Sequence, residues 1–264
     1  MVRTKVEYAT DNITTYRFCV HGCKYCWAWN IALFRKRIER GRYDPVSEAR
    51  KYLHRTNRVI VVSFTADPYP PIEREKEITR RVLEVLSKNP ANRVLILTKN
   101  PRLALRDLDL MWNHGDMWLG STVIVLDKTE WEPYAPEPMD RLKALKFAKK
   151  LGIKTWLSIE PIIPKLTWVE DIVNEALDYV DFFVLGAFNY TKQLGVKFID
   201  EELKIKWYRK HVPKAIELLK KVDLPEKARK VFNRFLELRG QLKAGKISRK
   251  DYIFELKKLQ EVLA

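Results

Sequence analysis

The chain has 264 residues, of which 46% are hydrophobic and 11% aromatic, and its formal net charge is +16. This composition excludes an intrinsically disordered protein, and the length favours one main globular domain with a substantial core. The sequence has no apolar leader and no run that could cross a membrane, so we expect a soluble, cytoplasmic protein. Its heavy use of Lys, Arg and Glu is typical of a thermophile.

The positive charge is concentrated towards the two ends of the chain. Residues 17–58 contain 11 Lys and Arg against 3 Asp and Glu, and residues 201–264 contain 18 against 9. The middle, residues 59–200, contains 19 against 20. A single basic stretch is usually an ordinary solvated surface. Two basic segments around a neutral middle favour a polyanionic partner, such as RNA or DNA.

In chain order, short strands alternate with amphipathic helices. The sequence predicts a first strand over 13–19, followed by a helix over 28–41 that ends at Gly41. Helices are also expected over 73–90 and 137–152. β-branched or aromatic runs, each closed by Pro, Asn or Asp, predict five more strands, within 58–71, 93–101, 117–127, 154–164 and 181–189. This alternation predicts an α/β fold with a parallel sheet covered by helices.

The stretch 225–264 has a different character from the rest of the chain. It is typical of two basic amphipathic helices, with Ser248 as the N-cap of the second and Asp251 at the capping-box position. We therefore expect a core domain over 1–224 and a basic helical hairpin over 225–264. The apolar side of the hairpin is expected to pack on the core, and its Lys and Arg side to contact a partner.

All three cysteines of the chain lie in the stretch "FCVHGCKYCWAW", as Cys19, Cys23 and Cys26. An odd number of clustered thiols cannot all form disulfides, so three metal ligands are indicated. A structural zinc site would need a fourth ligand from His21, His54 or a carboxylate. A four-iron cluster normally takes four thiolates, so three would leave one iron open. Thiols without a metal role are the remaining alternative.

The spacing Cys-x3-Cys-x2-Cys, followed by Trp27 and Trp29, resembles the signature of the radical S-adenosylmethionine (SAM) superfamily. The resemblance implies a 4Fe-4S cluster whose open iron binds the amino and carboxylate groups of SAM. It also implies that the strands form a partial (β/α)6 barrel. Sites in such barrels lie at the carboxyl ends of the strands. The strand-end residues are Cys19 to Cys26, Thr65 to Asp67, Thr98 to Asn100, Ser121, Thr122, Glu160, Asn189 and Tyr190.

Within that superfamily, the chain resembles the spore photoproduct lyase relatives, also called DNA repair photolyase-like proteins. The resemblance runs from residue 16 to about residue 222. It depends on "YRFCVHGCKYCWAW", "TADPYPPIE", "TRRVLEVL", "ILTKNP", "RDLDLM", "EPYAPEPMDRLKAL" and "EPIIP", in that order.

This resemblance implies roles for individual residues. Lys99 would contact the SAM carboxylate and Ser121 the carboxylate or ribose, while Tyr25 would approach the adenine. Thr65 and Asp67 would lie beside SAM and substrate, with Glu160 and Trp27 as further candidates at the barrel mouth. The alternative for each is an ordinary structural residue at a strand end.

Two departures limit the comparison with spore photoproduct lyase. That enzyme uses an additional cysteine near the "TAD" segment to return a hydrogen atom to its substrate radical, whereas this chain reads "SFTADPYP" there. Phe18 also replaces the Gly of the "YRGC" pattern. Repair of a thymine dimer is therefore not the expected reaction.

We interpret the chain as a radical SAM enzyme of lyase or transferase type that modifies or repairs RNA or DNA. It would need a reductant such as ferredoxin or flavodoxin. One alternative is a radical SAM enzyme acting on a peptide or small molecule, and another is a non-catalytic Fe-S protein. The sequence indicates no oligomeric state.

Overall fold

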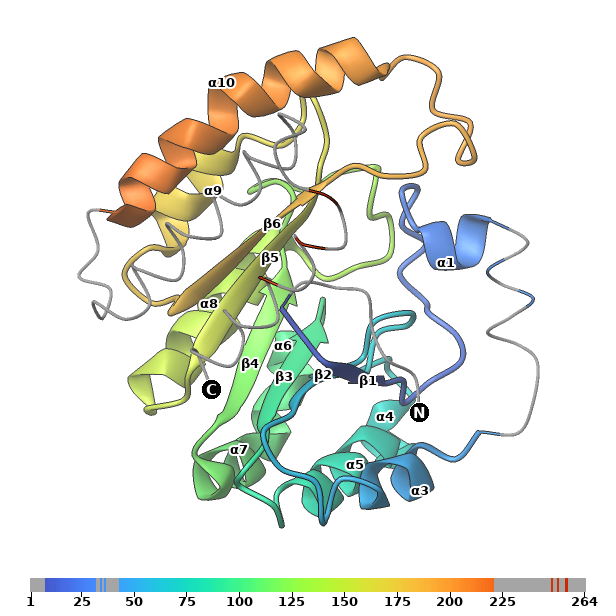
Figure 1. The fold of residues 1–264 in the computed structure, drawn as a ribbon, viewed down its shortest axis with the longest axis vertical. Helices are drawn as coiled ribbons and strands as arrows, with labels where there is room; N and C mark the ends of the chain where they lie inside the picture. The colour runs from blue at the N-terminus through green and yellow to red at the C-terminus, as the bar shows by residue number, and fades with distance from the viewer. Residues whose placement is uncertain are drawn as a thin grey trace.

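The computed structural model describes residues 8–31, 34, 36, 43–220, 248, 251 and 255. Within this part of the chain, six parallel strands form one curled sheet in the order β1-β2-β3-β4-β5-β6 (Figure 1). The strands are β1 Asp11–Ile13, β2 Val59–Val62, β3 Arg93–Thr98, β4 Met117–Thr122, β5 Thr155–Ile162 and β6 Phe182–Ala187. Spatial order follows chain order, with helical segments between strands. The predicted partial (β/α)6 barrel is thus confirmed.

Helices connect the strands and lie outside the sheet (Figure 1). Parallel strands need such crossovers, because each chain segment must return to the same end of the sheet. The helix predicted over 137–152 is present as α8 Pro138–Lys150, which begins with Pro138 at its first position and has Lys149 and Lys150 in its last turn. The stretch predicted as one helix over 73–90 instead forms two, α4 Glu73–Lys76 and α5 Ile78–Leu86, because Glu77 between them has a left-handed φ of +49°. The helices are α1 Trp27–Asn30, α3 Pro45–Arg50, α4 Glu73–Lys76, α5 Ile78–Leu86, α6 Pro101–Ala104, the 3-10 turn η1 Leu105–Asp107, α7 Leu108–His114, α8 Pro138–Lys150, α9 Val169–Ala176 and α10 Glu201–Lys220.

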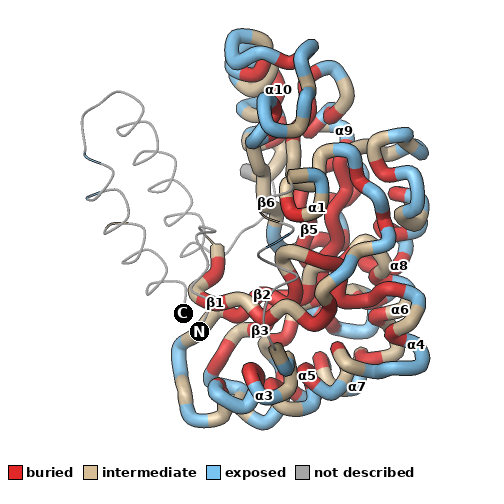
Figure 2. Tube along the Cα trace, turned by 90° about the vertical axis from the view of Figure 1, so that its right-hand side faces the viewer, coloured by how far each residue is buried: buried red, intermediate tan, exposed pale blue. Residues whose placement is uncertain are grey.

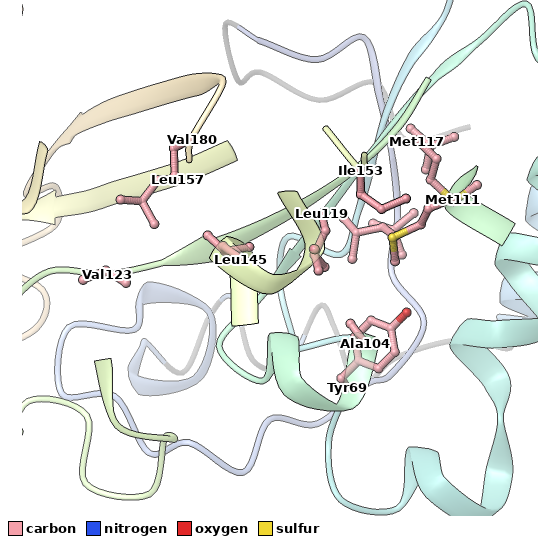
Figure 3. Packing of buried hydrophobic residues seen from close by; sticks show 14 of the residues in the cluster. Tyr69, Ala104, Met111, Met117, Leu119, Val123, Leu145, Ile153, Leu157 and Val180 are labelled. Atoms are coloured by element: carbon pink, nitrogen blue, oxygen red, sulfur yellow. The ribbon is translucent and has the colours of Figure 1, made fainter. Parts of the chain in front are cut away.

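The main hydrophobic core lies between the sheet and the helices. Alternate residues of each strand point into it, such as Ile60, Ile96 and Leu119, all fully buried. Figure 3 shows Leu119 of β4 packed with Leu145 of α8 and Ile153. Figure 2 shows the buried residues following the strands, while the exposed ones lie mainly on helices and loops. Strands β2 to β5 are largely buried on both faces, as a parallel sheet requires, whereas the edge strand β6 is mostly half-buried.

A second cluster fills the concave side of the sheet and contains Val61, Leu95 and Trp156. The Trp156 indole donates a hydrogen bond to the Ile96 carbonyl over 3.0 Å. It passes over Gly120, where an added Cβ would lie 2.2 Å from the indole nitrogen. A glycine is therefore required in β4 at this point. The apolar packing closes the concave side, leaving the polar strand-end residues beyond it.

The first strand and the helix after it differ from the prediction. The strand spans Asp11–Ile13, earlier and shorter than 13–19, because Thr14 to Cys19 leave the sheet to reach the cysteine loop. Asp11 stays in the strand although it is fully buried, since Arg58 forms an ion pair with it at 2.8 Å. Of the helix predicted over 28–41, the structure describes α1, residue 31 and two further helical positions, 34 and 36.

The predicted hairpin over 225–264 lies outside the described residues, apart from positions 248, 251 and 255. At these positions, the Asp251 backbone N–H donates to Ser248 Oγ over 3.1 Å, and Ser248 Oγ donates to Asp251 Oδ2 over 2.6 Å. The first bond is the one expected of an N-cap serine, whereas the second joins the two side chains and is not the backbone bond of a capping box. The division into two domains stays a prediction.

Candidate functional site

The cysteine loop follows β1 and leads directly into α1. All three thiols are free; Cys23 is buried, and Cys19 and Cys26 are half-buried. A turn fixes the last two, because the Cys26 N–H donates to the Cys23 carbonyl over 3.0 Å and the Asn30 amide donates to the same carbonyl over 3.0 Å. The thiols are therefore presented by a loop with defined backbone geometry.

The segment between β4 and α8 holds this loop in place. Backbone hydrogen bonds join Lys24 to Trp131 over 2.9 Å and Tyr134 to His21 over 3.2 Å. Gly22 has a φ of +63°, and a Cβ there would lie 2.8 Å from the Tyr134 ring. Glycine at this position allows both the left-handed turn and the close approach of the ring. The loop position thus depends on a segment more than a hundred residues away in the sequence.

The donor set fits an iron-sulfur cluster better than a single zinc ion. In the described part of the chain, no group of three or more His, Cys, Asp or Glu side chains converges to hold one metal ion. In a four-iron cluster each thiolate binds a different iron, so the three thiols need not point at one metal ion. His21 is already bonded to Asp67, and exposed His54 precedes β2, at the opposite end of the sheet. Burial raises the pKa of each thiol and so favours its protonated form. Binding to a metal would favour the deprotonated thiolate instead, because the thiolate is the form that acts as a ligand.

Asp67 and Lys99, predicted as site residues, are brought together. Asp67 follows β2 and is buried; its Oδ2 accepts from the Lys99 backbone N–H over 2.7 Å and lies 2.8 Å from His21 Nε2. Its Oδ1 accepts from Thr98 Oγ1 over 2.6 Å. Burial works to raise the pKa of Asp67, but the His21 ring and these hydrogen bonds lower it to about 2. Asp67 is therefore ionised at neutral pH, and its hydrogen bonds connect the carboxyl ends of β2 and β3 to His21 of the cysteine loop.

Glu132 lies at the centre of a buried ionic group that the sequence did not predict. Its Oε2 is 2.6 Å from Arg141 Nη2, and its Oε1 is 3.7 Å from Lys99 Nζ. The Tyr25 hydroxyl donates to Oε1, and Lys99 Nζ lies 5.4 Å from the centre of the Tyr25 ring. Burial and the Glu132 carboxylate raise the pKa of Tyr25, so its hydroxyl stays protonated. Lys99 and the buried Arg141 share this one carboxylate, and Lys99 is the more distant of the two, so its ammonium could also meet an anionic ligand group.

The remaining predicted residues have different environments. Ser121 is fully buried, on the same side of β4 as Leu119, and its hydroxyl donates to the Thr98 carbonyl over 2.7 Å. Thr65 is half-buried; its hydroxyl lies 3.1 Å from that of Thr14, and its carbonyl accepts from the Trp29 indole over 3.0 Å. Thr65 thus lies at the barrel mouth, whereas Ser121 supports the strand end that precedes Lys99.

Glu160, in β5, belongs to a separate group of hydrogen-bonded polar side chains. Its Oε2 accepts from Ser158 Oγ over 2.8 Å and from the Tyr8 hydroxyl over 3.5 Å. Gly186 of β6 makes space for it, because a Cβ there would lie 2.2 Å from Glu160 Oε1. Burial, followed by Glu160, raises the pKa of Tyr8, so this phenol remains a hydrogen-bond donor. Glu160 is therefore a carboxylate acceptor on the concave side of the sheet.

Aromatic side chains gather where the first, second and sixth strands end. Trp27 lies 6.4 Å from Phe64 and 6.3 Å from Tyr190, measured between ring centres. Phe34 contacts both Trp27 and Tyr190, at 5.1 and 5.5 Å. Of the strand-end residues at β6, Asn189 is exposed and Tyr190 is 42% exposed. The predicted mouth residues Trp27 and Tyr190 are thus in contact.

Residues 13–178 match the family model described as the Radical SAM superfamily. An uncharacterized protein of Methanocaldococcus jannaschii is 29% identical over 236 residues, covering 84% of this chain and 90% of the relative. An uncharacterized protein of Acidianus two-tailed virus is 25% identical over 252 residues, covering 84% and 79%. In the described part of the chain, no helix has the length and apolar character of a membrane span.

Two similar solved structures are both variants of spore photoproduct lyase. One, in complex with a dinucleoside spore photoproduct, has a TM-score of 0.48 and 18% identity, covering 79% of this chain and 60% of that one. The second has a TM-score of 0.49 and 16% identity, covering 79% and 61%. The chain thus spans about 60% of the length of those structures.

Proposed function

The chain belongs to the radical SAM superfamily, and from this premise we propose that its substrate is a nucleic acid. Membership confirms the predicted superfamily, the enzymatic radical chemistry and the two cofactors, a 4Fe-4S cluster and SAM. When bound, these supply a 5′-deoxyadenosyl radical, formed together with methionine by one-electron cleavage of SAM, which abstracts a hydrogen atom from the substrate. The electron would come from a low-potential donor such as ferredoxin or flavodoxin.

We assign the roles of the chain's own residues from their positions. Cys19, Cys23 and Cys26 would hold three irons, leaving the fourth open to SAM. The Lys99 ammonium, which lies 3.7 Å from Glu132 Oε1, would contact the SAM carboxylate. Tyr25 would border the adenine from the cysteine loop. Ser121 would act indirectly, by holding the Thr98 carbonyl just before Lys99.

The charge distribution supports the choice of substrate. The excess of 9 positive charges in residues 201–264 includes a described part on α10, where Lys206, Arg209 and Lys210 are exposed. These three line a shallow hollow together with Glu202 and Ile205. Exposed cations in such an arrangement suit a phosphate backbone better than a small neutral substrate.

Salt dependence tests the substrate proposal. Binding of single-stranded RNA or DNA should weaken steeply with salt, with a log-log slope of about −3 to −6, taking ~0.7 per neutralised phosphate. Replacing Lys206, Arg209 and Lys210 by Gln should reduce the slope by about 2 if all three contact phosphates. Lys143→Gln, an exposed change on α8, serves as the control. If the protein binds neither RNA nor DNA at low salt, a peptide or small-molecule substrate is the better assignment.

The reaction type is a separate question from binding. Anaerobic reconstitution with SAM and dithionite, followed by mass spectrometry of the treated nucleic acid, would identify the product. A fragment lost or a bond broken in the substrate would support a lyase, and an added group a transferase.

The Lys99→Ala variant should bind SAM about 10- to 100-fold more weakly, because it removes a charge-assisted contact that contributes roughly 1.5 to 3 kcal/mol. Calorimetry on the anaerobically reconstituted protein would measure this, with iron content as a check on the cluster. Lys24→Ala is a matched control, since Lys24 is an exposed lysine of the cysteine loop that pairs with Glu130 at 2.6 Å. Equal SAM affinity in Lys99→Ala and the wild type would contradict the assignment.

A further inference from the structure

The aromatic group formed by Trp27, Phe34, Phe64 and Tyr190 joins segments that are far apart in the sequence. Trp27 follows the last cysteine, Phe64 follows β2, and Tyr190 follows β6. Because β1 and β6 are the two edges of an open sheet, the contact between Trp27 and Tyr190 joins the chain segments that leave opposite edges. The group therefore borders the barrel mouth next to the cysteine loop. In the proposed reaction, hydrogen abstraction would take place near this loop, because it would hold the cluster.

These rings are not ordinary core residues. Among the described residues, the buried hydrophobic clusters and their packed neighbours include Phe64 but not Trp27, Phe34 or Tyr190. Tyr190 is 42% exposed, and its backbone has a φ of +60°, in the left-handed region. A tyrosine in that region is uncommon and costs free energy, so the surrounding structure has to impose it. The fold thus keeps an exposed ring in a strained position at the mouth.

Positive charge flanks the aromatic group. Lys36 comes two positions after Phe34, and Lys192 and Lys197 lie in the turns that follow Tyr190; all three are exposed. A hydrogen bond from Leu194 N–H to the Tyr190 carbonyl, over 2.9 Å, keeps this segment folded against its own start. Aromatic faces beside exposed cations are what unpaired nucleotides require, because bases stack on the rings while phosphates meet the charges.

We propose that Trp27 and Tyr190 form the stacking surface that receives the unpaired base of a single-stranded nucleic acid at the barrel mouth. This inference rests on the proposed function and adds to it the part of the substrate that enters the site. A base inside a duplex could not reach this surface, so a paired target would first have to leave its stack. An apolar peptide would gain nothing from the surrounding lysines.

The test compares a short single-stranded oligonucleotide with the same strand carrying one abasic site at its centre, bound to the full-length, reconstituted protein. The wild type should bind the complete strand about 5- to 100-fold more tightly, the range expected for one stacked base. The salt slope should be equal for the two strands, since they carry the same phosphates. Equal affinity for the two strands would overturn the inference and leave the nucleic-acid proposal standing.

Two substitutions locate the surface. Tyr190→Leu and Trp27→Leu should each reduce the preference for the complete strand without changing the salt slope, because neither removes a phosphate contact. Trp112→Leu is the matched control, since Trp112 is 74% exposed on α7, away from the strand ends. If Tyr190→Leu and Trp27→Leu both keep the wild-type preference for the complete strand over the abasic strand, the base does not stack on these two rings. No binding of either strand at low salt would defeat the proposed function itself and the inference with it.

Discussion

Alanine at Cys19, Cys23 or Cys26 is expected to abolish the iron-sulfur absorbance and SAM cleavage together. In the proposed site each thiolate would bind its own iron, and the chain has only these three cysteines, so no other thiol could replace a lost ligand. Absorbance after anaerobic reconstitution and the release of 5′-deoxyadenosine in the presence of dithionite would measure the two losses.

Val20→Ala is the control for this experiment, because Val20 lies in the same loop, is 40% exposed and offers no ligand atom. It should keep both the absorbance and the cleavage. Normal SAM cleavage in any cysteine variant would contradict the ligand assignment. Anaerobically prepared protein that retains zinc tightly and takes up no iron would instead favour the structural zinc site.

Much of the fold could be predicted because its signals are local. The run "VIVV" in β2 is apolar throughout, since a parallel strand is buried on both faces, and similar runs predict β3 to β6. β1 lacks such an apolar run, because it contains Asp11. This carboxylate can be buried only because the distant Arg58 forms an ion pair with it. A sequence pattern does not reveal which residue will neutralise a buried charge. The prediction therefore placed the strand on the more apolar residues that follow.

Part of the site could be predicted from the sequence and part could not. The cysteines and Lys99 could be proposed from short motifs. Glu132 and Arg141 both lie in "EPYAPEPMDRLKAL", which contributed to the family resemblance, but nothing in that stretch indicated that they pair. Only the folded chain brings Arg141 of α8, Lys99 after β3 and Tyr25 of the cysteine loop to one carboxylate. Spatial convergence of this kind has no counterpart in residue spacing.

Loss of the Glu132 carboxylate is expected to destabilise the protein strongly. Glu132→Gln would leave the buried Arg141 and the half-buried Lys99 without this anion, and breaking a buried pair such as Glu132–Arg141 costs about 3 to 5 kcal/mol. Unfolding of the metal-free protein in urea would measure the change, so that the cluster contributes nothing to it. A lower midpoint with an unchanged denaturant slope would indicate a true loss of stability.

Glu130→Gln is a matched control two residues earlier. Glu130 forms an ion pair with Lys24 at 2.6 Å, but both side chains are largely exposed, so little change in the midpoint is expected. Arg141→Met in the Glu132→Gln background should cost less than the sum of the single changes, because it removes one of the unpaired cations. If Glu132→Gln and Glu130→Gln unfold at the same urea concentration, the buried ionic group does not stabilise the fold.

The pH dependence gives an independent readout of the same group. Burial works to raise the pKa of Glu132, but Lys99 and Arg141 lower it below the ordinary glutamate value of 4.5. A carboxylate with a lowered pKa stabilises the folded state fully above its unfolded value, and this contribution is lost as the pH falls through the folded value. The wild type should therefore lose stability below about pH 4.5 more steeply than Glu132→Gln, which carries no titrating group at this position. Parallel acid unfolding curves would show that the Glu132 carboxylate does not stabilise the folded protein through its pairs with Lys99 and Arg141.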